Sequence, residues 1–228
     1  MNESYQALVR ERLRQMADEI RKILTEVGDP NRSVRVIAVT KYIGVAEMEE
    51  LVQAGVVAAG ENRWQVAREK VLEFPQVEWH FIGPLQRNKV RHVARHFAWV
   101  QSVDRVEVAA ELAKHAREFG KTITVLIQVN ISGEAQKSGV TLEQAGALVV
   151  ACKNFEGIVV KGFMGIARQT GDEHTLRREF GLLRTLRDDL REQTGLALPE
   201  LSMGMSEDYA VAIEEGATML RIGRKLIL

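Results

Sequence analysis

The sequence is poor in several residue types whose abundance would mark a specialised protein. Cys152 is the only cysteine among 228 residues, which excludes an intramolecular disulfide and a cysteine-rich zinc site. It lies in the apolar run GALVVACKNF, which favours a small buried thiol over a reactive one. The chain has only four prolines, and we find no linker or low-complexity segment. Nothing in the composition therefore divides the chain, and we expect one domain over residues 1–228.

The sequence also lacks an excess of charge of either sign. Lys plus Arg and Asp plus Glu both number 31, and aromatic residues make up 6% of the chain. Nucleic-acid binding relies on a basic excess and on aromatic stacking, so we expect no nucleic-acid partner. No apolar run approaches transmembrane length, and the start MNESYQALVRERLRQ is too charged for a signal peptide. We therefore expect a cytoplasmic protein that does not bind membranes.

What is present begins with an amphipathic helix, expected over residues 1–28 and ended by Gly28-Asp29-Pro30. Apolar residues recur in it at spacings of four and three: Val9, Leu13, Met16, Ile20, Ile23 and Val27. We expect this helix to pack on the rest of the domain. A self-association helix is the alternative.

After Pro30, short β-branched segments alternate with helical ones. The candidate strands cover residues 34–40, 56–60, 77–83, 98–103, 122–130, 157–167, 199–205 and 218–223. Eight strand–helix units predict an α/β fold, a (β/α)8 TIM barrel over residues 34–228. An open doubly wound sheet is the alternative, although no strand is followed by a glycine-rich nucleotide-binding motif. Asp104 with Glu107, and Thr141 with Gln144, have the spacing of helix-capping pairs.

Functional groups of a parallel barrel gather at the carboxyl ends of its strands. Lys41 lies at the end of the first strand, and a desolvated lysine there can form a Schiff base with an aldehyde. The alternative is a lysine that merely reaches into solvent. His80, at the end of the third strand, either lines the pocket or is a hydrogen-bonded interior histidine.

The last two units predict a site for an anion. SMGMS, residues 202–206, precedes a helix expected to begin near Ser206, and RIG ends the eighth strand. Small residues at a helix N-terminus allow backbone N–H groups to approach phosphate. Because strands eight and one are neighbours in a closed barrel, this site would lie beside Lys41. A phosphorylated aldehyde would suit both groups.

Histidines and basic residues elsewhere give weaker signals. We expect His115 and His174 to be solvated, and no histidine pair has metal-ligand spacing with a carboxylate, so we expect no metal. A basic helix face carries Arg87, Arg91 and Arg95, and Lys89 beside it would add positive potential near a phosphorylated ligand.

These features resemble the pyridoxal 5′-phosphate (PLP) homeostasis proteins, single-domain relatives of the alanine racemase barrel. The resemblance rests on VIAVTK, GENR, WHFIGPLQRNK, VNISGEAQKSGV, GFMGIA and LSMGMSEDYAVAIEEGATMLRIG, which cover almost the whole chain in order. It implies a fold type III PLP-binding barrel in which Lys41 holds PLP as a Schiff base and Asn62 lies near the ring. The remaining implied cofactor-binding residues are Ser202, Met203, Gly204, Ser206, Arg221, Gly223 and Arg224.

Within that set, the resemblance implies that the phosphate is received largely by backbone groups and that Arg221 faces the pyridine nitrogen. An arginine keeps its proton, which would leave that nitrogen unprotonated and the ring a weaker electron sink. Two features depart from the pattern: Arg224 replaces a small hydroxyl residue, and the sequence ends in KLIL where relatives continue with an aromatic residue and a glycine.

Three functions follow from these residues. The first is a carrier or regulator in intracellular PLP (vitamin B6) homeostasis that is not an enzyme. The second is a PLP-dependent amino-acid racemase, for which the resemblance implies a tyrosine from a further domain. We expect Tyr42 to point away from Lys41, and neither Tyr5 nor Tyr209 is an evident substitute. The third is a cofactor-free Schiff-base aldolase. PLP-dependent apoenzymes are candidate partners, and we expect a monomer or a weak homodimer.

Overall fold

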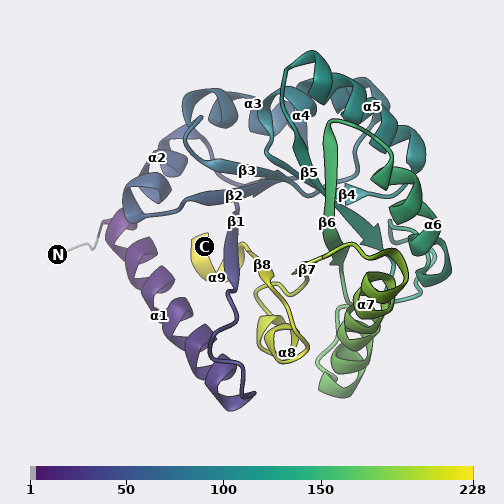
Figure 1. The fold of residues 1–228 in the computed structure, drawn as a ribbon. Coiled ribbons are helices and arrows are strands. Elements are labelled where there is room, and N and C mark those ends of the chain that lie inside the picture. Colours follow the sequence, from purple (N-terminus) through teal and green to yellow (C-terminus); the bar gives the residue numbers. More distant parts are fainter. Residues whose placement is uncertain (1–3, 228) are drawn as a thin grey trace.

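The computed structural model describes residues 4–227 and has eight parallel strands closed into a barrel, with helices around it (Figure 1). The strands are β1 (Arg35–Val39), β2 (Ala58–Glu61), β3 (Glu78–Phe81), β4 (Trp99–Val103), β5 (Ile123–Val129), β6 (Ile158–Gly165), β7 (Glu200–Ser202) and β8 (Met219–Ile222). Seven of them lie within their predicted segments, and β2 extends one residue beyond its segment, to Glu61. Because β1 pairs with β8 as well as with β2, the barrel is confirmed and the open sheet is excluded.

The helices between the strands follow the predicted alternation. They are α2 (Val45–Ala54), α3 (Trp64–Glu73), α4 (Val90–His96) after the 3-10 turn η1 (Arg87–Lys89), α5 (Val106–Glu118), α6 (Leu142–Lys153), α7 (Glu173–Thr194), α8 (Tyr209–Glu214) and α9 (Arg224–Ile227). The predicted capping box of α6 is confirmed, since Thr141 and Gln144 bond each other's backbone N–H groups. The predicted Asp104 cap is wrong. Arg105 occupies that position, and its guanidinium binds the Asp104 carboxylate at 2.6 Å.

Helix α1 (Tyr5–Glu26) lies in the outer ring between α2 and α8 (Figure 1). Its buried side chains Val9, Met16, Ile20 and Leu24 belong to the main hydrophobic core, which confirms that it packs on the barrel. The Tyr5 hydroxyl donates to the Ile227 carbonyl at 2.9 Å, so α1 also contacts the short closing helix α9. The KLIL ending therefore forms a helix as far as Ile227, and Leu228 lies outside the described residues.

The hydrophobic residues form two clusters separated by the sheet. The large one fills the space between the strands and the helices, as in other barrels of this kind. The small one contains Trp99, Leu126, Met164 and Met219. Gln101 lies 3.7 Å from the Met219 sulfur, which places this second cluster inside the barrel beside polar side chains. The interior is therefore only partly apolar, and its polar part leads to the strand ends described below.

Within residues 4–227, none of the helices combines the length and the apolar character needed to cross a bilayer.

Candidate functional site

Lys41 lies in a turn just beyond the carboxyl end of β1. The strand ends at Val39, and the Ile43 N–H donates to the Thr40 carbonyl at 3.2 Å. Lys41 is partly buried, and its Nζ lies 4.9 Å from the centre of the Tyr42 ring. The expectation that Tyr42 points away from Lys41 is wrong, because the strand pleat ends before the turn begins. The amine is thus presented at the strand end beside a solvent-exposed phenol.

The loops after β7 and β8 lie side by side next to β1. The Arg221 N–H donates to the Gly204 carbonyl at 3.0 Å, and the Lys225 N–H donates to the Ser206 hydroxyl at 3.3 Å. A Cβ built on Gly223 would lie 3.6 Å from the Cβ of Val39. The two predicted anion-binding loops are therefore neighbours of the strand that leads to Lys41.

The two glycines of these loops have different reasons to be glycine. Gly204 has φ +92°, and a Cβ there would lie 2.6 Å from the Ala212 Cβ, so the fold itself excludes a side chain. Gly223 has no positive φ, and an added Cβ would make only ordinary contact with Val39. The fold would therefore tolerate a Cβ at Gly223, and the absence of a side chain there leaves open space beside the loop. Within residues 4–227, the N–H groups of Ser206 and Gly223 donate to no other residue, so they are available to an anion.

Arg221 is buried, with 4% of its surface exposed, between the ends of β6, β7 and β8. Its Nη1 donates to the carbonyl and to the hydroxyl of Ser202, both at 2.7 Å, and its Nη2 donates to the Gly165 carbonyl at 2.9 Å. Burial lowers the pKa of the guanidinium to about 10, although Asp208 acts in the opposite direction. Arg221 therefore stays positive at neutral pH. Because a guanidinium has five N–H donors, donors beyond those three bonds remain for a ligand.

A chain of hydrogen bonds runs from Arg221 through the barrel interior. The Ser202 hydroxyl donates to Gln101 Oε1 at 2.6 Å, and Gln101 Nε2 lies 2.8 Å from His80 Nδ1. His80 Nε2 lies 3.0 Å from the Glu78 carboxylate, which Arg35 also binds, at 2.9 Å. These partners confirm the interior role of His80 and exclude it from the pocket.

The partners also fix the protonation of His80. Burial lowers the pKa of its imidazole, although Glu78 acts in the opposite direction. A neutral imidazole accepts from the Gln101 amide at Nδ1 and donates to Glu78 from Nε2. The hydrogen bond from His80 in turn holds the pKa of the Glu78 carboxyl at about 2.

Ser202 and Met203, which were predicted to bind the cofactor, bond to other residues of the protein instead. Ser202 uses its hydroxyl and its carbonyl on Gln101 and Arg221, and the Met203 N–H donates to the Met219 carbonyl at 3.1 Å. The Ser202 hydroxyl and carbonyl and the Met203 N–H are therefore engaged inside the protein and are not free to bind an anion. The helix expected to begin near Ser206 begins only at Tyr209, after a turn.

Arg224 and Asn62 flank the site at opposite sides. The Arg224 guanidinium lies 3.4 Å from Glu207 and both side chains are exposed, so it points to solvent while its backbone opens α9. Asn62 directly follows β2 and is partly buried. A Cβ on Gly83 would lie 2.3 Å from the Asn62 carbonyl oxygen, so the glycine after β3 allows the two loops to touch.

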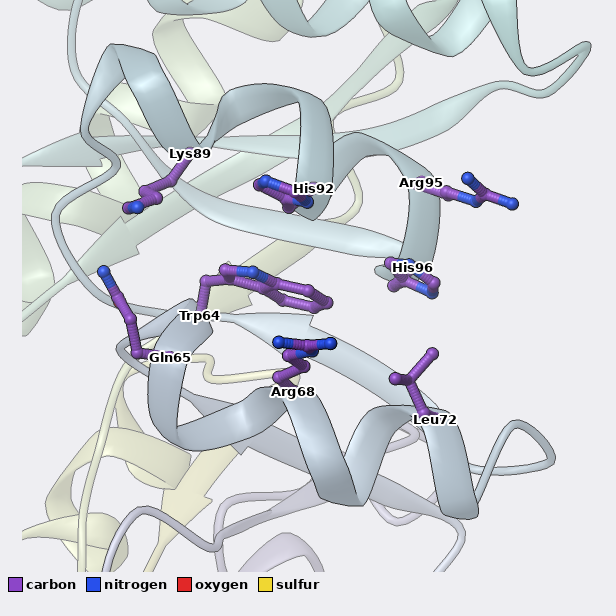
Figure 2. Close-up of a pocket in the computed structure, with 8 residues that line it drawn as sticks. All are labelled: Trp64, Gln65, Arg68, Leu72, Lys89, His92, Arg95 and His96. Carbon is purple, nitrogen blue, oxygen red and sulfur yellow. The ribbon is translucent and has the colours of Figure 1, made fainter.

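A separate groove of about 630 Å³ lies outside the barrel between α3 and α4 (Figure 2). The Trp64 ring stacks with His92 and with His96, each at 5.2 Å between ring centres, which gives both histidines a packing role. Figure 2 shows Lys89 and Gln65 facing each other across this groove. Lys89 therefore directs its charge toward α3, and its predicted contribution near a phosphorylated ligand stays a prediction.

The sequence interpretation missed three residues of the site and misplaced one histidine. Gln101 links Ser202 to His80, and Lys70 with Glu61 forms a buried ion pair below the Lys41 turn. Lys70 lies at helical spacing from the buried Trp64 and Ala67, a signal that could have placed it on the inner face of α3. The expectation that His115 is solvated is wrong: it is buried, and its Nδ1 lies 3.0 Å from Glu118.

Comparisons with known proteins agree with this fold. The family model described as the alanine racemase N-terminal domain matches residues 12–227. The chain is 39% identical over 220 residues to the pyridoxal phosphate homeostasis protein of Pseudomonas aeruginosa, covering 96% of this chain and 94% of that protein. It is 37% identical over 224 residues to the protein of the same name from Pasteurella multocida, covering 94% of each.

Among solved structures, PipY of Synechococcus elongatus without PLP matches with a TM-score of 0.87 and 32% identity, covering 96% of this chain and 100% of PipY. The structure of PipY with PLP bound matches with a TM-score of 0.80, covering 92% of this chain and 100% of PipY. The fold and the matched model define a barrel of the alanine racemase class. Within that class, the chain belongs to the pyridoxal phosphate homeostasis protein family.

Proposed function

We propose that this chain binds PLP through Lys41 and acts in cellular PLP homeostasis as a carrier or regulator rather than as a catalyst. The observation that carries the proposal is the position of Lys41. It lies at the strand end beside the paired loops after β7 and β8 and, within residues 4–227, forms no ion pair with a carboxylate. The relatives named for PLP homeostasis and the PLP-bound PipY support the same ligand.

Each part of PLP has a matching group in the site. The aldehyde of PLP condenses with a lysine amine, with loss of water, to form a Schiff base. The backbone of Gly204, Ser206, Gly223 and Arg224 would receive the phosphate. Asn62 and Arg221 would face the ring. The open space at Gly223 and the free N–H groups of Ser206 and Gly223 fit an anion without rearrangement of the loops.

Arg221 supports a carrier more than an enzyme. With a pKa of about 10 it remains a hydrogen-bond donor at neutral pH, and its bonds to Ser202 and Gly165 hold its orientation. A donor facing the ring nitrogen keeps that nitrogen unprotonated, which weakens PLP as an electron sink. Demanding carbanion chemistry is then disfavoured.

A racemase is the second candidate, and Tyr42 is the observation in its favour. Its phenol is exposed beside the Lys41 amine, and a two-base reaction would need it to reach the face of PLP opposite that amine. Incubation of the PLP-loaded protein with L-alanine separates the candidates. If the wild type abolishes the optical rotation and Tyr42→Phe does not, the protein is a racemase. If the wild type leaves the rotation unchanged, the result agrees with the carrier.

The first test is the absorption spectrum of the purified protein with PLP, followed by borohydride reduction and peptide mass mapping. We expect a violet-blue absorbing band and a fixed pyridoxyl adduct on Lys41, both lost in Lys41→Ala and kept in Lys22→Ala, which changes an exposed lysine of α1. A protein that takes up no PLP would overturn the proposal and leave a cofactor-free aldolase as the remaining Schiff-base function.

Transfer of PLP to PLP-dependent apoenzymes and a monomeric or weakly dimeric state belong to the same proposal. Sedimentation over a range of concentrations measures the second. Recovery of activity by an apoenzyme mixed with the loaded protein, faster than with an equal amount of free PLP, would support direct transfer.

A further inference from the structure

A buried lysine lies directly beneath the turn that carries Lys41. Lys70 comes from α3, points toward the barrel and is 2% exposed. Its Nζ donates to the Thr40 carbonyl at 2.6 Å, to the Ile43 carbonyl at 2.9 Å and to the Glu61 carboxylate. An ammonium has three N–H donors, so these three acceptors use all of them. Lys70 therefore has no capacity left for a ligand, and its role is to hold these three groups together.

The two carbonyls are the two ends of the Lys41 turn. Thr40 precedes Lys41, Ile43 follows Tyr42, and a hydrogen bond of 3.2 Å from the Ile43 N–H closes the turn at the Thr40 carbonyl. The Thr40 hydroxyl also donates to Glu61 at 2.6 Å. Any displacement of the turn would have to break bonds to the Lys70 ammonium or to the Glu61 carboxylate.

The same pair holds the other side of the site. Glu61 is fully buried as the last residue of β2, and Asn62 follows it directly. Thr40 and Lys70 both bind Oε1 of the carboxylate, while Oε2 is buried and has no partner within residues 4–227. Burying two charges and leaving one oxygen unbonded costs stability that an apolar pair of similar size would not cost. A gain in stability therefore does not explain why Lys70 and Glu61 form a buried ion pair here.

We propose that Lys70 and Glu61 are positioning residues that fix Lys41 and Asn62 in the geometry needed for Schiff-base formation. The inference rests on the proposed function, because it names what aims the reactive amine. Preorganising an amine on a rigid turn raises its effective concentration at the aldehyde, and a misplacement of about 1 Å costs on the order of a hundredfold in rate. Without the Lys70 ammonium, the carbonyls of Thr40 and Ile43 both lose the donor that ties the turn to α3, and only the Ile43 N–H still donates to Thr40.

The test compares Lys70→Met with the double variant Lys70→Met/Glu61→Leu. The single variant leaves a buried carboxylate without its cation, so it loses stability as well as positioning. The double variant removes that unpaired charge, so we expect it to unfold at a higher urea concentration than the single variant does. Arg68→Met, an exposed cation two residues earlier on the same helix, is the matched control.

The readouts are the rate of PLP adduct formation at Lys41, trapped with borohydride, and amide hydrogen exchange of residues 40–44 and 61–63 without PLP. For the double variant we expect adduct formation slower by about tenfold to a hundredfold and faster exchange in both segments. Wild-type rates and wild-type exchange in a stable double variant would overturn the inference. If the wild type forms no adduct while exchange still rises in the variant, the proposed function fails and the positioning role remains.

Discussion

Replacing Gln101 by leucine tests whether the hydrogen-bond chain inside the barrel stabilises the fold. Gln101 is fully buried and bridges Ser202 and His80, which are themselves 0% exposed. Leucine has a similar volume but no polar atoms, so Gln101→Leu leaves the O–H of Ser202 without an acceptor, although Arg221 still donates to its oxygen, and leaves His80 Nδ1 without a donor. Each buried polar group left unpaired costs about 1–3 kcal/mol, so together they cost about 2–6 kcal/mol.

Part of that loss is offset because the leucine side chain adds apolar contact with the cluster around Met219. We therefore expect the free energy of unfolding to fall by about 2–5 kcal/mol, a large share of the ~5–15 kcal/mol typical of a domain. Urea unfolding followed by far-UV circular dichroism measures the loss. The matched control is Met164→Leu in the same interior cluster, a volume-conserving change that should cost less than about 1.5 kcal/mol.

A Gln101→Leu variant no less stable than Met164→Leu would refute this account. The hydrogen bonds of the interior would then contribute nothing net, and the orientation of Arg221 would have to depend on the backbone carbonyls of Ser202 and Gly165 alone.

The remaining predictions concern acid stability, the thiol and the two loop glycines. Burial holds the pKa of His80 below its ordinary 6.5, so the unfolded chain takes up this proton at a higher pH than the native state does. The contribution of neutral His80 to stability is therefore fully present above about pH 6.5 and is lost as the pH drops below it. In urea midpoints measured against pH, His80→Gln should show a shallower fall, and a slope equal to that of the wild type would contradict a neutral, buried His80. Burial raises the pKa of the Cys152 thiol to about 12, so a thiol reagent should label it only after unfolding, and rapid labelling of the native protein would count against its burial. Gly204→Ala should lower the urea midpoint by an amount equivalent to about 1–3 kcal/mol, because a Cβ there overlaps Ala212. Gly223→Ala should keep the wild-type midpoint yet lose PLP on gel filtration, and a variant that keeps its PLP would show that the space at Gly223 is not used.

The sequence predicted the barrel because short β-branched segments and helical patterns are local properties of the chain. Seven strands lie within their predicted segments and β2 exceeds its segment by one residue, and β8 and β1 are neighbours because the barrel is closed. That closure was enough to bring the loop at Gly204 and the loop at Gly223 beside the strand that leads to Lys41. Strand ends are predictable in this fold because the topology sends every one of them to the same side.

The supporting residues could not be predicted in the same way. Ser202 on β7 meets Gln101 on β4 across the interior, and Gln101 meets His80 on the adjacent β3, so the chain depends on the stagger of β4 and β7, two strands that are not neighbours. Lys70 looks like an ordinary helix lysine beside Glu69, and its partner Glu61 looks like part of a loop motif. The helical spacing can place Lys70 on the inner face of α3, but which strand end that face meets is a tertiary property, so the pattern alone does not pair Lys70 with Glu61.

The direction of the interior chain has a consequence for chemistry at the strand ends. Arg221 donates to Ser202, Ser202 to Gln101, Gln101 to His80, and His80 to Glu78, so every donor points away from the site. Moving a proton along this chain toward the site would require each donor to reverse, and Arg221 would have to become an acceptor, which a guanidinium with a pKa of about 10 does not do at neutral pH. The chain can therefore orient Arg221 but cannot deliver a proton to a bound ligand. An acid or base acting there has to come from outside this chain, and Tyr42, beside Lys41, makes Tyr42→Phe the variant that most directly separates a carrier from a racemase.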